Sequence, residues 1–178
     1  FKKVYGLRSL RSSDALEVMQ AIWTRPSFEV HGIAGGYQGR GIKTIVPPFA
    51  EAKVSLRLVP NQTPAKAFEL LKAEVKRLNP DVVVERQSAL APFRGNAAGR
   101  LTEVASRALR FGFGKSPAFV REGGSIGAVV TMQRHLRCPI QLVGLSLPDH
   151  GYHAPNEYFA WGQASGGIKT FATYFELL

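Results

Sequence analysis

The chain has 178 residues, of which 45% are hydrophobic and 20% are charged, a composition typical of globular proteins that excludes disorder and collagen-like repeats. Its length allows one or two domains. The single cysteine, Cys138, cannot form an internal disulfide, and no cysteine pair is present for a zinc ribbon. From this cysteine usage we expect a cytoplasmic location. We also expect no membrane span, because no stretch approaches the roughly 18 uncharged apolar residues of a membrane helix.

The charge is strongly basic, with 23 Lys and Arg against 13 Asp and Glu, a net charge of +10 and a pI of about 10.1. A basic balance fits anionic partners, including nucleic acid. However, no run of basic residues exceeds two, and no arginine-rich stripe alternates with aromatic residues. The pattern therefore favours a basic solvent-facing surface, and a nucleic-acid-binding module is the less favoured alternative.

Hydrophobic periodicity and turn residues predict the elements of the first half. In chain order they are a helix after Ser13 and Asp14 that ends before Pro26, a strand over 28–33, a glycine-rich loop over 35–41, a strand from residue 50, a helix from residue 64 and a strand over 81–87. The strand from residue 50 alternates, with Lys53, Ser55 and Arg57 on its polar face. Thr63 is placed to cap the following helix, with Pro64 at its first position.

The irregular stretch over 88–96 is the best linker in the sequence, so we place a domain boundary between 1–88 and 89–178. Helices and strands alternate beyond it. In order they are a helix over 97–111, a strand over 118–121, a helix over 126–136, a strand over 140–145 and a final helix from about 157. This order predicts an α/β arrangement with a parallel sheet.

The polar loop over 146–157 follows an apolar strand, at the place where α/β sheets bind ligands. It carries carboxylate and imidazole groups that Zn²⁺ accepts, namely Asp149, His150, His153 and Glu157. On the residues alone, a surface or capping role is the favoured interpretation of both histidines. A metal site in this loop is the alternative interpretation.

The sequence Arg-Glu-Gly-Gly-Ser-Ile over 121–126 joins a predicted strand to a helix. Its adjacent glycines allow close approach of a ligand, and the first amides of the helix could hold a carboxylate or phosphate. A tight structural turn is the alternative interpretation. A hydrolase nucleophile at Ser125 is not favoured, because the segment lacks the Gly-x-Ser-x-Gly elbow.

Six segments in register carry a resemblance over almost the whole chain: 23–33 (Trp-Thr-Arg-Pro-Ser-Phe-Glu-Val-His-Gly-Ile), 35–36, 41–47, 52–62, 121–126 and 147–157 (Leu-Pro-Asp-His-Gly-Tyr-His-Ala-Pro-Asn-Glu). They resemble the two-metal zinc peptidases and amidases that include carnosinase-like dipeptidases, acetylornithine deacetylase, succinyl-diaminopimelate desuccinylase and carboxypeptidase G. The carnosinase-like branch is the most similar. The sequence departs from the family at Gly127, where a proline is common, and at His150, where a second acidic residue is common.

The resemblance implies an α+β lid, or dimerisation, domain over 1–88 that lacks its first strand, followed over 89–178 by the carboxyl-terminal part of an α/β catalytic domain. It implies a homodimer through the lid and a small peptide or acyl-amino acid substrate. Two zinc ions would occupy each active site, with cobalt or manganese as alternatives. The implied site residues are His153 as a zinc ligand, Arg57 as the partner of the substrate carboxylate, Thr44 as a residue reaching the neighbouring subunit's site, and Gly123, Gly124 and Ser125 as the segment holding the carboxylate end of the substrate.

The family's remaining metal ligands and its general base lie upstream of residue 1 by the same resemblance. We therefore expect the chain to be the carboxyl-terminal part of a longer metallopeptidase and to be inactive alone, since one histidine cannot hold a zinc pair. A non-catalytic fragment or subunit that uses the lid only for dimerisation is the main alternative.

Overall fold

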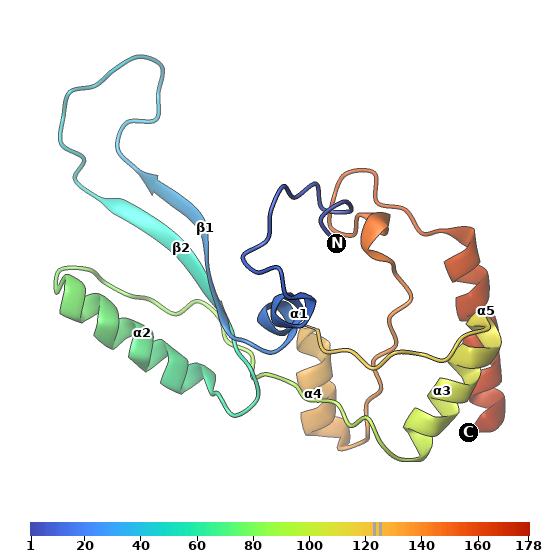
Figure 1. Ribbon diagram of the computed structural model, residues 1–178. Helices are drawn as coiled ribbons and strands as arrows, with labels where there is room; N and C mark the ends of the chain where they lie inside the picture. The colour runs from blue at the N-terminus through green and yellow to red at the C-terminus, as the bar shows by residue number, and fades with distance from the viewer. Residues whose placement is uncertain (123, 125) are drawn as a thin grey trace. The chain divides into compact units, whose positions relative to one another are not determined.

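The computed structural model describes residues 1–122, 124 and 126–178 (Figure 1). The chain forms two compact units. One is built on residues 20–93 and the other on residues 1–19, 94–122 and 126–178. Among the described residues, no helix combines the length and the apolar character needed to cross a bilayer.

The unit built on residues 20–93 contains an antiparallel hairpin of β1 (Ser27–Gly35) and β2 (Ala50–Arg57). The pairing places Ser27 opposite Arg57 and Glu29 opposite Ser55. Between Val30 and Gly32 the register shifts, so His31 is the extra residue of a bulge. The predicted polar face of the second strand is confirmed, and the register adds polar residues of the first strand to it.

Two helices begin where their capping residues predict. In α2 (Pro64–Leu78), the Thr63 hydroxyl accepts a hydrogen bond from the Lys66 amide at 3.3 Å, and proline occupies the first position. In α1 (Ala15–Trp23), the Asp14 carboxylate accepts bonds from the amides of Leu16 and Glu17 at 2.7 and 3.1 Å. Each cap satisfies amides that the helix itself leaves without a partner.

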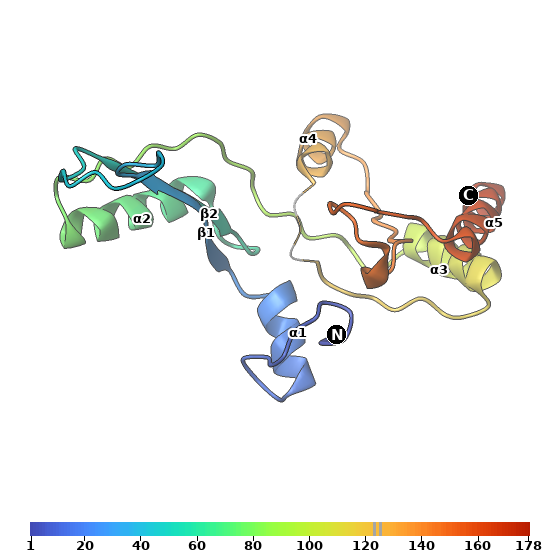
Figure 2. The same cartoon turned by 90° about the horizontal axis from the view of Figure 1, so that it is seen from above.

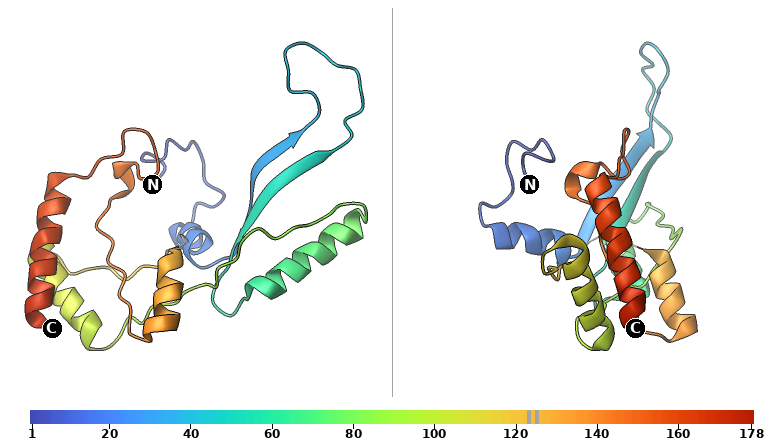
Figure 3. Two further views of the ribbon diagram at one scale, coloured as in Figure 1. Left: turned by 180° about the vertical axis from the view of Figure 1, so that it is seen from behind. Right: turned by 90° about the vertical axis from the view of Figure 1, so that its right-hand side faces the viewer.

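The other unit has its core where α3 (Arg100–Phe113) packs beside α5 (Trp161–Leu177), as Figures 2 and 3 show. The buried apolar residues of α3 lie on one stripe, Val104, Ala105 and Ala108. The facing stretch of α5 buries Gly166, Gly167 and Thr170. A Cβ at Gly112 would overlap the Thr170 hydroxyl and lie 2.5 Å from the Gly166 carbonyl oxygen, so glycine permits this close approach.

Three predicted strands, over 81–87, 118–121 and 140–145, are irregular in the structure. A strand needs a neighbour to pair its amides and carbonyls, and the sheet of the described residues contains only β1 and β2. Val83 is 81% exposed, so apolar composition does not bury the first of these segments. Instead the Arg86 guanidinium lies 5.6 Å from the Phe68 ring centre of α2. The mixed helix and sheet class is confirmed, but the described residues form no parallel sheet.

The remaining helix predictions hold with shifted ends. A helix forms over Gly127–Leu136 (α4), and the last helix begins at Trp161, four residues beyond the predicted start. A short 3₁₀ helix, η1 (Pro148–His150), precedes it. The chain then turns back, and the Tyr158 amide donates to the His150 carbonyl at 3.0 Å. Residues 157–160, which the sequence predicts to begin the last helix, therefore belong to this turn.

Candidate functional site

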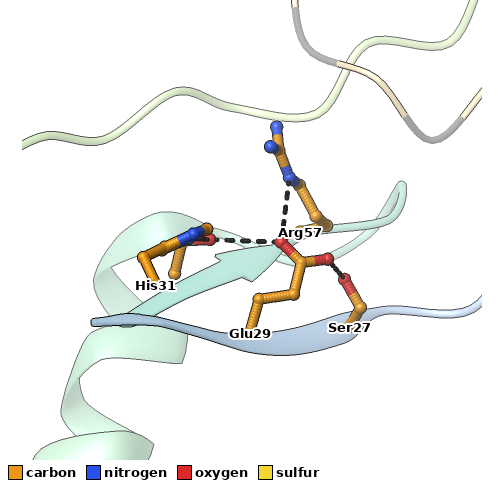
Figure 4. Close-up of polar contacts among 5 residues, drawn as sticks. Ser27, Glu29, His31 and Arg57 are labelled. Atoms are coloured by element: carbon orange, nitrogen blue, oxygen red, sulfur yellow. Dashed lines mark hydrogen bonds and ion pairs between the residues drawn. The ribbon is translucent and has the colours of Figure 1, made fainter. Parts of the chain in front are cut away.

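The polar face of the hairpin gathers five side chains at the end of the hairpin remote from its loop (Figure 4). The Glu29 carboxylate lies at its centre. Its Oε1 accepts a hydrogen bond from the Ser27 hydroxyl at 2.6 Å, and its Oε2 accepts one from the Ser55 hydroxyl at 3.4 Å. The Arg57 Nε lies 3.6 Å from the same Oε2. The His31 Nε2 is 2.6 Å from the Ser55 Oγ and extends the network onto the bulge.

The electrostatics of this face favour the charged form of Glu29. The Ser27 hydrogen bond contributes most to lowering the pKa of Glu29 below its usual 4.5, and Arg57 and Ser55 lower this pKa further, while desolvation acts in the opposite direction. The side chains of Arg57 and Glu29 are 44% and 42% exposed. An ion pair this exposed contributes at most about 1 kcal/mol to stability.

Arg57 therefore lies on the polar face of the strand, as the alternation of the sequence predicts. The Glu29 carboxylate of the same chain lies beside it. Figure 4 shows its two terminal nitrogens pointing away from Glu29. A guanidinium can hold a carboxylate in bidentate fashion through its two terminal nitrogens or through Nε and one of them, and Arg57 turns its Nε toward Glu29.

Sequence reasoning missed Ser27, Glu29 and His31 as members of this network. Their signal is alternation: polar residues at 27, 29 and 31 interleave with Phe28 and Val30. Such a pattern places the three on one strand face. The pairing register of the two strands cannot be inferred from this alternation. That register places Glu29 between Ser55 and Arg57.

Thr44 lies in the exposed loop that connects β1 to β2. Arg57 pairs with Ser27 at the opposite end of the hairpin. At about 3.3 Å per residue, the intervening strand length separates the two by roughly 20 Å or more. Within one chain, therefore, Thr44 and Arg57 are not neighbours. The loop also exposes apolar side chains, with Ile42 at 94% and Val46 at 86%.

His153 and His150 have opposite environments. His153 is exposed and has a φ of +63°, in the left-handed region. His150 is only 2% exposed, and its Nδ1 accepts a hydrogen bond from the Leu147 amide at 3.3 Å. Its ring packs against the rings of Tyr158 and Phe159, with centres 5.0 and 5.5 Å away. His150 thus anchors the turn internally, while His153 projects from it.

Few donor groups in the described part of this chain are placed to hold a metal ion. Across residues 1–122, 124 and 126–178, no group of three or more His, Cys, Asp or Glu side chains is arranged to hold one. The exposed His153 imidazole suits Zn²⁺ as a single ligand. Of the glycine turn, Gly124 is described, and Gly123 and Ser125 lie outside the described residues. A cavity of about 150 Å³ between α3, α5 and residues 139–143 involves none of the predicted site residues.

Residues 2–83 match the model of the peptidase dimerisation domain of the M20 type. The Cys-Gly metallodipeptidase dug1 of Schizosaccharomyces pombe is 30% identical over 167 residues, covering 90% of this chain and 35% of that protein. The Beta-Ala-His dipeptidase of Homo sapiens is 30% identical over 169 residues, covering 89% and 32%.

Among solved structures, the M20 family metallo-carboxypeptidase Sso-CP2 from Sulfolobus solfataricus superposes with a TM-score of 0.86 at 28% identity. The match covers 99% of this chain and 41% of that one. The chain spans about a third of the length of the curated relatives it matches.

Proposed function

Because the chain is related to the M20 metallopeptidases, as its motifs indicate, we propose that it is the carboxyl-terminal portion of an enzyme that hydrolyses the amide bond of a dipeptide or acyl-amino acid. The observation that supports this most directly is Arg57. It stands on the polar face of the matched dimerisation domain, and its terminal nitrogens point away from the hairpin. A guanidinium so presented suits the free carboxylate of a small peptide.

In this proposal residues 1–88 form the lid and residues 89–178 the carboxyl-terminal part of the catalytic domain. The lid joins two copies into a homodimer, which is supported by the match to a dimerisation domain. Thr44 and Arg57 lie at opposite ends of the hairpin. We therefore assign Arg57 and Thr44 to different active sites of the dimer, with Thr44 reaching the site of the neighbouring subunit.

The substrate carboxylate is bound by Arg57, while Gly123, Gly124 and Ser125 hold the same end of the substrate. Adjacent glycines let the backbone approach the ligand, and the amides at the start of α4 (Gly127–Leu136) favour an anion. Such groups orient the substrate, and orientation supplies a large part of the rate enhancement in a hydrolase.

His153 supplies one ligand of a zinc pair in this proposal, with cobalt or manganese as alternative metals. Such metal ions polarise a scissile carbonyl and bring the pKa of a bound water close to 7. The general base and the other ligands belong to the longer protein. The isolated chain is therefore inactive, and the enzyme works in the cytoplasm.

The decisive experiment is to express the longer coding sequence and test its product. An upstream His-x-Asp motif and a Glu-Glu pair are expected, together with metal-dependent hydrolysis of Cys-Gly or β-Ala-His, the substrates named for the relatives. Removal of the metal by a chelator should abolish turnover, and zinc should restore it. A longer protein that lacks both motifs and turns over neither dipeptide would favour the non-catalytic dimerisation subunit.

A further inference from the structure

The Glu29 carboxylate is held from several directions. Ser27 donates to one oxygen at 2.6 Å and Ser55 donates to the other at 3.4 Å. Both serines are half-buried, whereas the apolar neighbours Phe28 and Val30 are more than half exposed. Two hydroxyl donors on one carboxylate restrict its rotation, so Glu29 presents a fixed oxygen to its third partner, the Arg57 Nε at 3.6 Å.

We infer that Glu29 is a positioning residue for Arg57. It holds the guanidinium by its Nε side and thereby aims the terminal nitrogens away from the hairpin, toward the carboxylate of the substrate. This inference rests on the proposed role of Arg57 in binding that carboxylate. Ser27 and Ser55 act indirectly on Arg57, because they hold the Glu29 carboxylate that holds the guanidinium.

The physical basis is the shape of the guanidinium. Its donors form a rigid plane, so a carboxylate at the Nε side leaves the terminal edge pointing in a defined direction. An exposed arginine otherwise loses considerable rotamer freedom when it binds a ligand. A side chain held in place beforehand loses less of that freedom, and the ligand binds more tightly.

The opposite role would be competition, in which Glu29 occupies Arg57 and must be displaced by the substrate. The geometry disfavours this role. Glu29 approaches through Nε, whereas Figure 4 shows the terminal nitrogens directed away from it. The two roles predict opposite signs: removing a positioning carboxylate weakens substrate binding, and removing a competitor strengthens it.

A matched control lies on the same hairpin. Lys53 Nζ is 3.7 Å from Glu51 Oε1, a distance close to that of the Arg57 pair, and these side chains are 69% and 61% exposed. Glu51→Gln removes the same charge from the same hairpin without touching the network around Arg57. It therefore corrects for general effects of charge.

The first test uses the chain itself and needs no catalysis. The Nε–H resonance of Arg57 is followed by ¹H–¹⁵N NMR in Glu29→Gln and Glu51→Gln, with the thermal melting of each variant as a check on folding. Glu29→Gln should shift this resonance and speed its exchange with water at least several-fold, while Glu51→Gln should leave both unchanged. An Arg57 resonance that is the same in Glu29→Gln as in the parent chain would overturn the inference.

The second test uses the full-length enzyme with a dipeptide and its carboxyl-amidated analogue. Glu29→Gln should raise KM for the free dipeptide about 3- to 10-fold, as expected for a partial loss of preorganisation, with kcat and the amidated substrate little changed. A lowered KM would establish competition and reject positioning.

Arg57→Ala distinguishes a failure of the proposed role of Arg57 from a failure of the role of Glu29. If it impairs both substrates equally, the proposed role of Arg57 fails; if it is selective while Glu29→Gln has no effect, only the role of Glu29 fails.

Discussion

His150 and His153 are three residues apart in one turn, yet the first is 2% exposed and the second is exposed to solvent. His150 is held by the Leu147 amide and by the rings of Tyr158 and Phe159. His153 has a left-handed backbone conformation, and its ring lies beside that of Tyr152, with ring centres 6.0 Å apart. Burial thus separates a histidine that stabilises the turn from one whose imidazole is accessible to a ligand.

The first prediction is that His150→Ala and His153→Ala have opposite profiles. His150→Ala removes a buried ring and a hydrogen-bond acceptor, so it should lower the free energy of unfolding of the chain by about 1–3 kcal/mol. His153→Ala removes an exposed side chain and should change it by less than about 0.5 kcal/mol. Urea unfolding of the two variants measures the difference.

The same two variants of the full-length enzyme should differ in metal content. Elemental analysis should find metal lost from His153→Ala and retained in folded His150→Ala; equal loss would reject His153 as the ligand.

The second prediction concerns the acid titration of Glu29. Because its folded pKa is lowered, the charged form contributes stability above the unfolded value of about 4.5, and this contribution is lost as the pH falls through the lower folded pKa. The contribution is below about 1 kcal/mol because the pair is exposed. Ser27→Ala should move the pKa of Glu29 upward more than Ser55→Ala does, since the Ser27 hydrogen bond is the stronger influence. Titration of the Glu29 side-chain carboxyl by ¹³C NMR gives both values, and an unchanged pKa in Ser27→Ala would contradict the assignment.

The third prediction tests the packing of α3 against α5. Gly112→Ala places a methyl group against the Thr170 hydroxyl and the Gly166 carbonyl, so it should destabilise the chain by about 1–3 kcal/mol through overpacking. Gly162→Ala is the matched control, because a methyl group there meets no atom within 4 Å. It lies within α5, so the higher helix propensity of alanine should leave stability equal or raise it by up to about 1 kcal/mol. Thermal melting that ranks the two variants the other way would show that the helices are not so closely packed.

Local signals in the sequence were sufficient for the parts of the fold that depend on neighbouring residues. Asp14 and Thr63 cap their helices because a capping bond spans only two or three residues. The stripe around Val104 and Ala108 is buried because one helix face carries it. These features require no knowledge of distant partners.

Features that depend on distant pairing could not be predicted in the same way. Residues 140–145 have the composition of a strand but form none, since composition does not supply a partner strand. Glu29 and Arg57 are 28 positions apart, and the bulge at His31 affects the register between their strands. Arg57 could be proposed as a site residue from its motif, whereas the carboxylate beside it is visible only in the folded hairpin.

The fourth prediction is that the isolated chain has no peptidase activity. A metal ion on His153 alone would be held mainly by water, and the described residues contain no cluster of three ligands. Purified chain with added zinc should therefore hydrolyse Cys-Gly and β-Ala-His no faster than zinc alone. Turnover at the rate of a full-length dipeptidase would mean that this chain assembles a complete site, and the assignment of roles would have to be abandoned.

The last prediction concerns Arg57→Lys in the full-length enzyme. Lysine keeps the positive charge but replaces the planar fork with a single ammonium group, so a carboxylate held in bidentate fashion should bind more weakly by about 1.5–3 kcal/mol. Lysine also lacks the Nε donor that faces Glu29, so the side chain loses its fixed direction together with its fork. Both effects act on the free carboxylate of the substrate and on nothing else in it. Steady-state kinetics should therefore show the loss with a dipeptide and not with its carboxyl-amidated analogue. Equal impairment of both substrates, or of neither, would require the carboxylate-binding residue to be sought elsewhere.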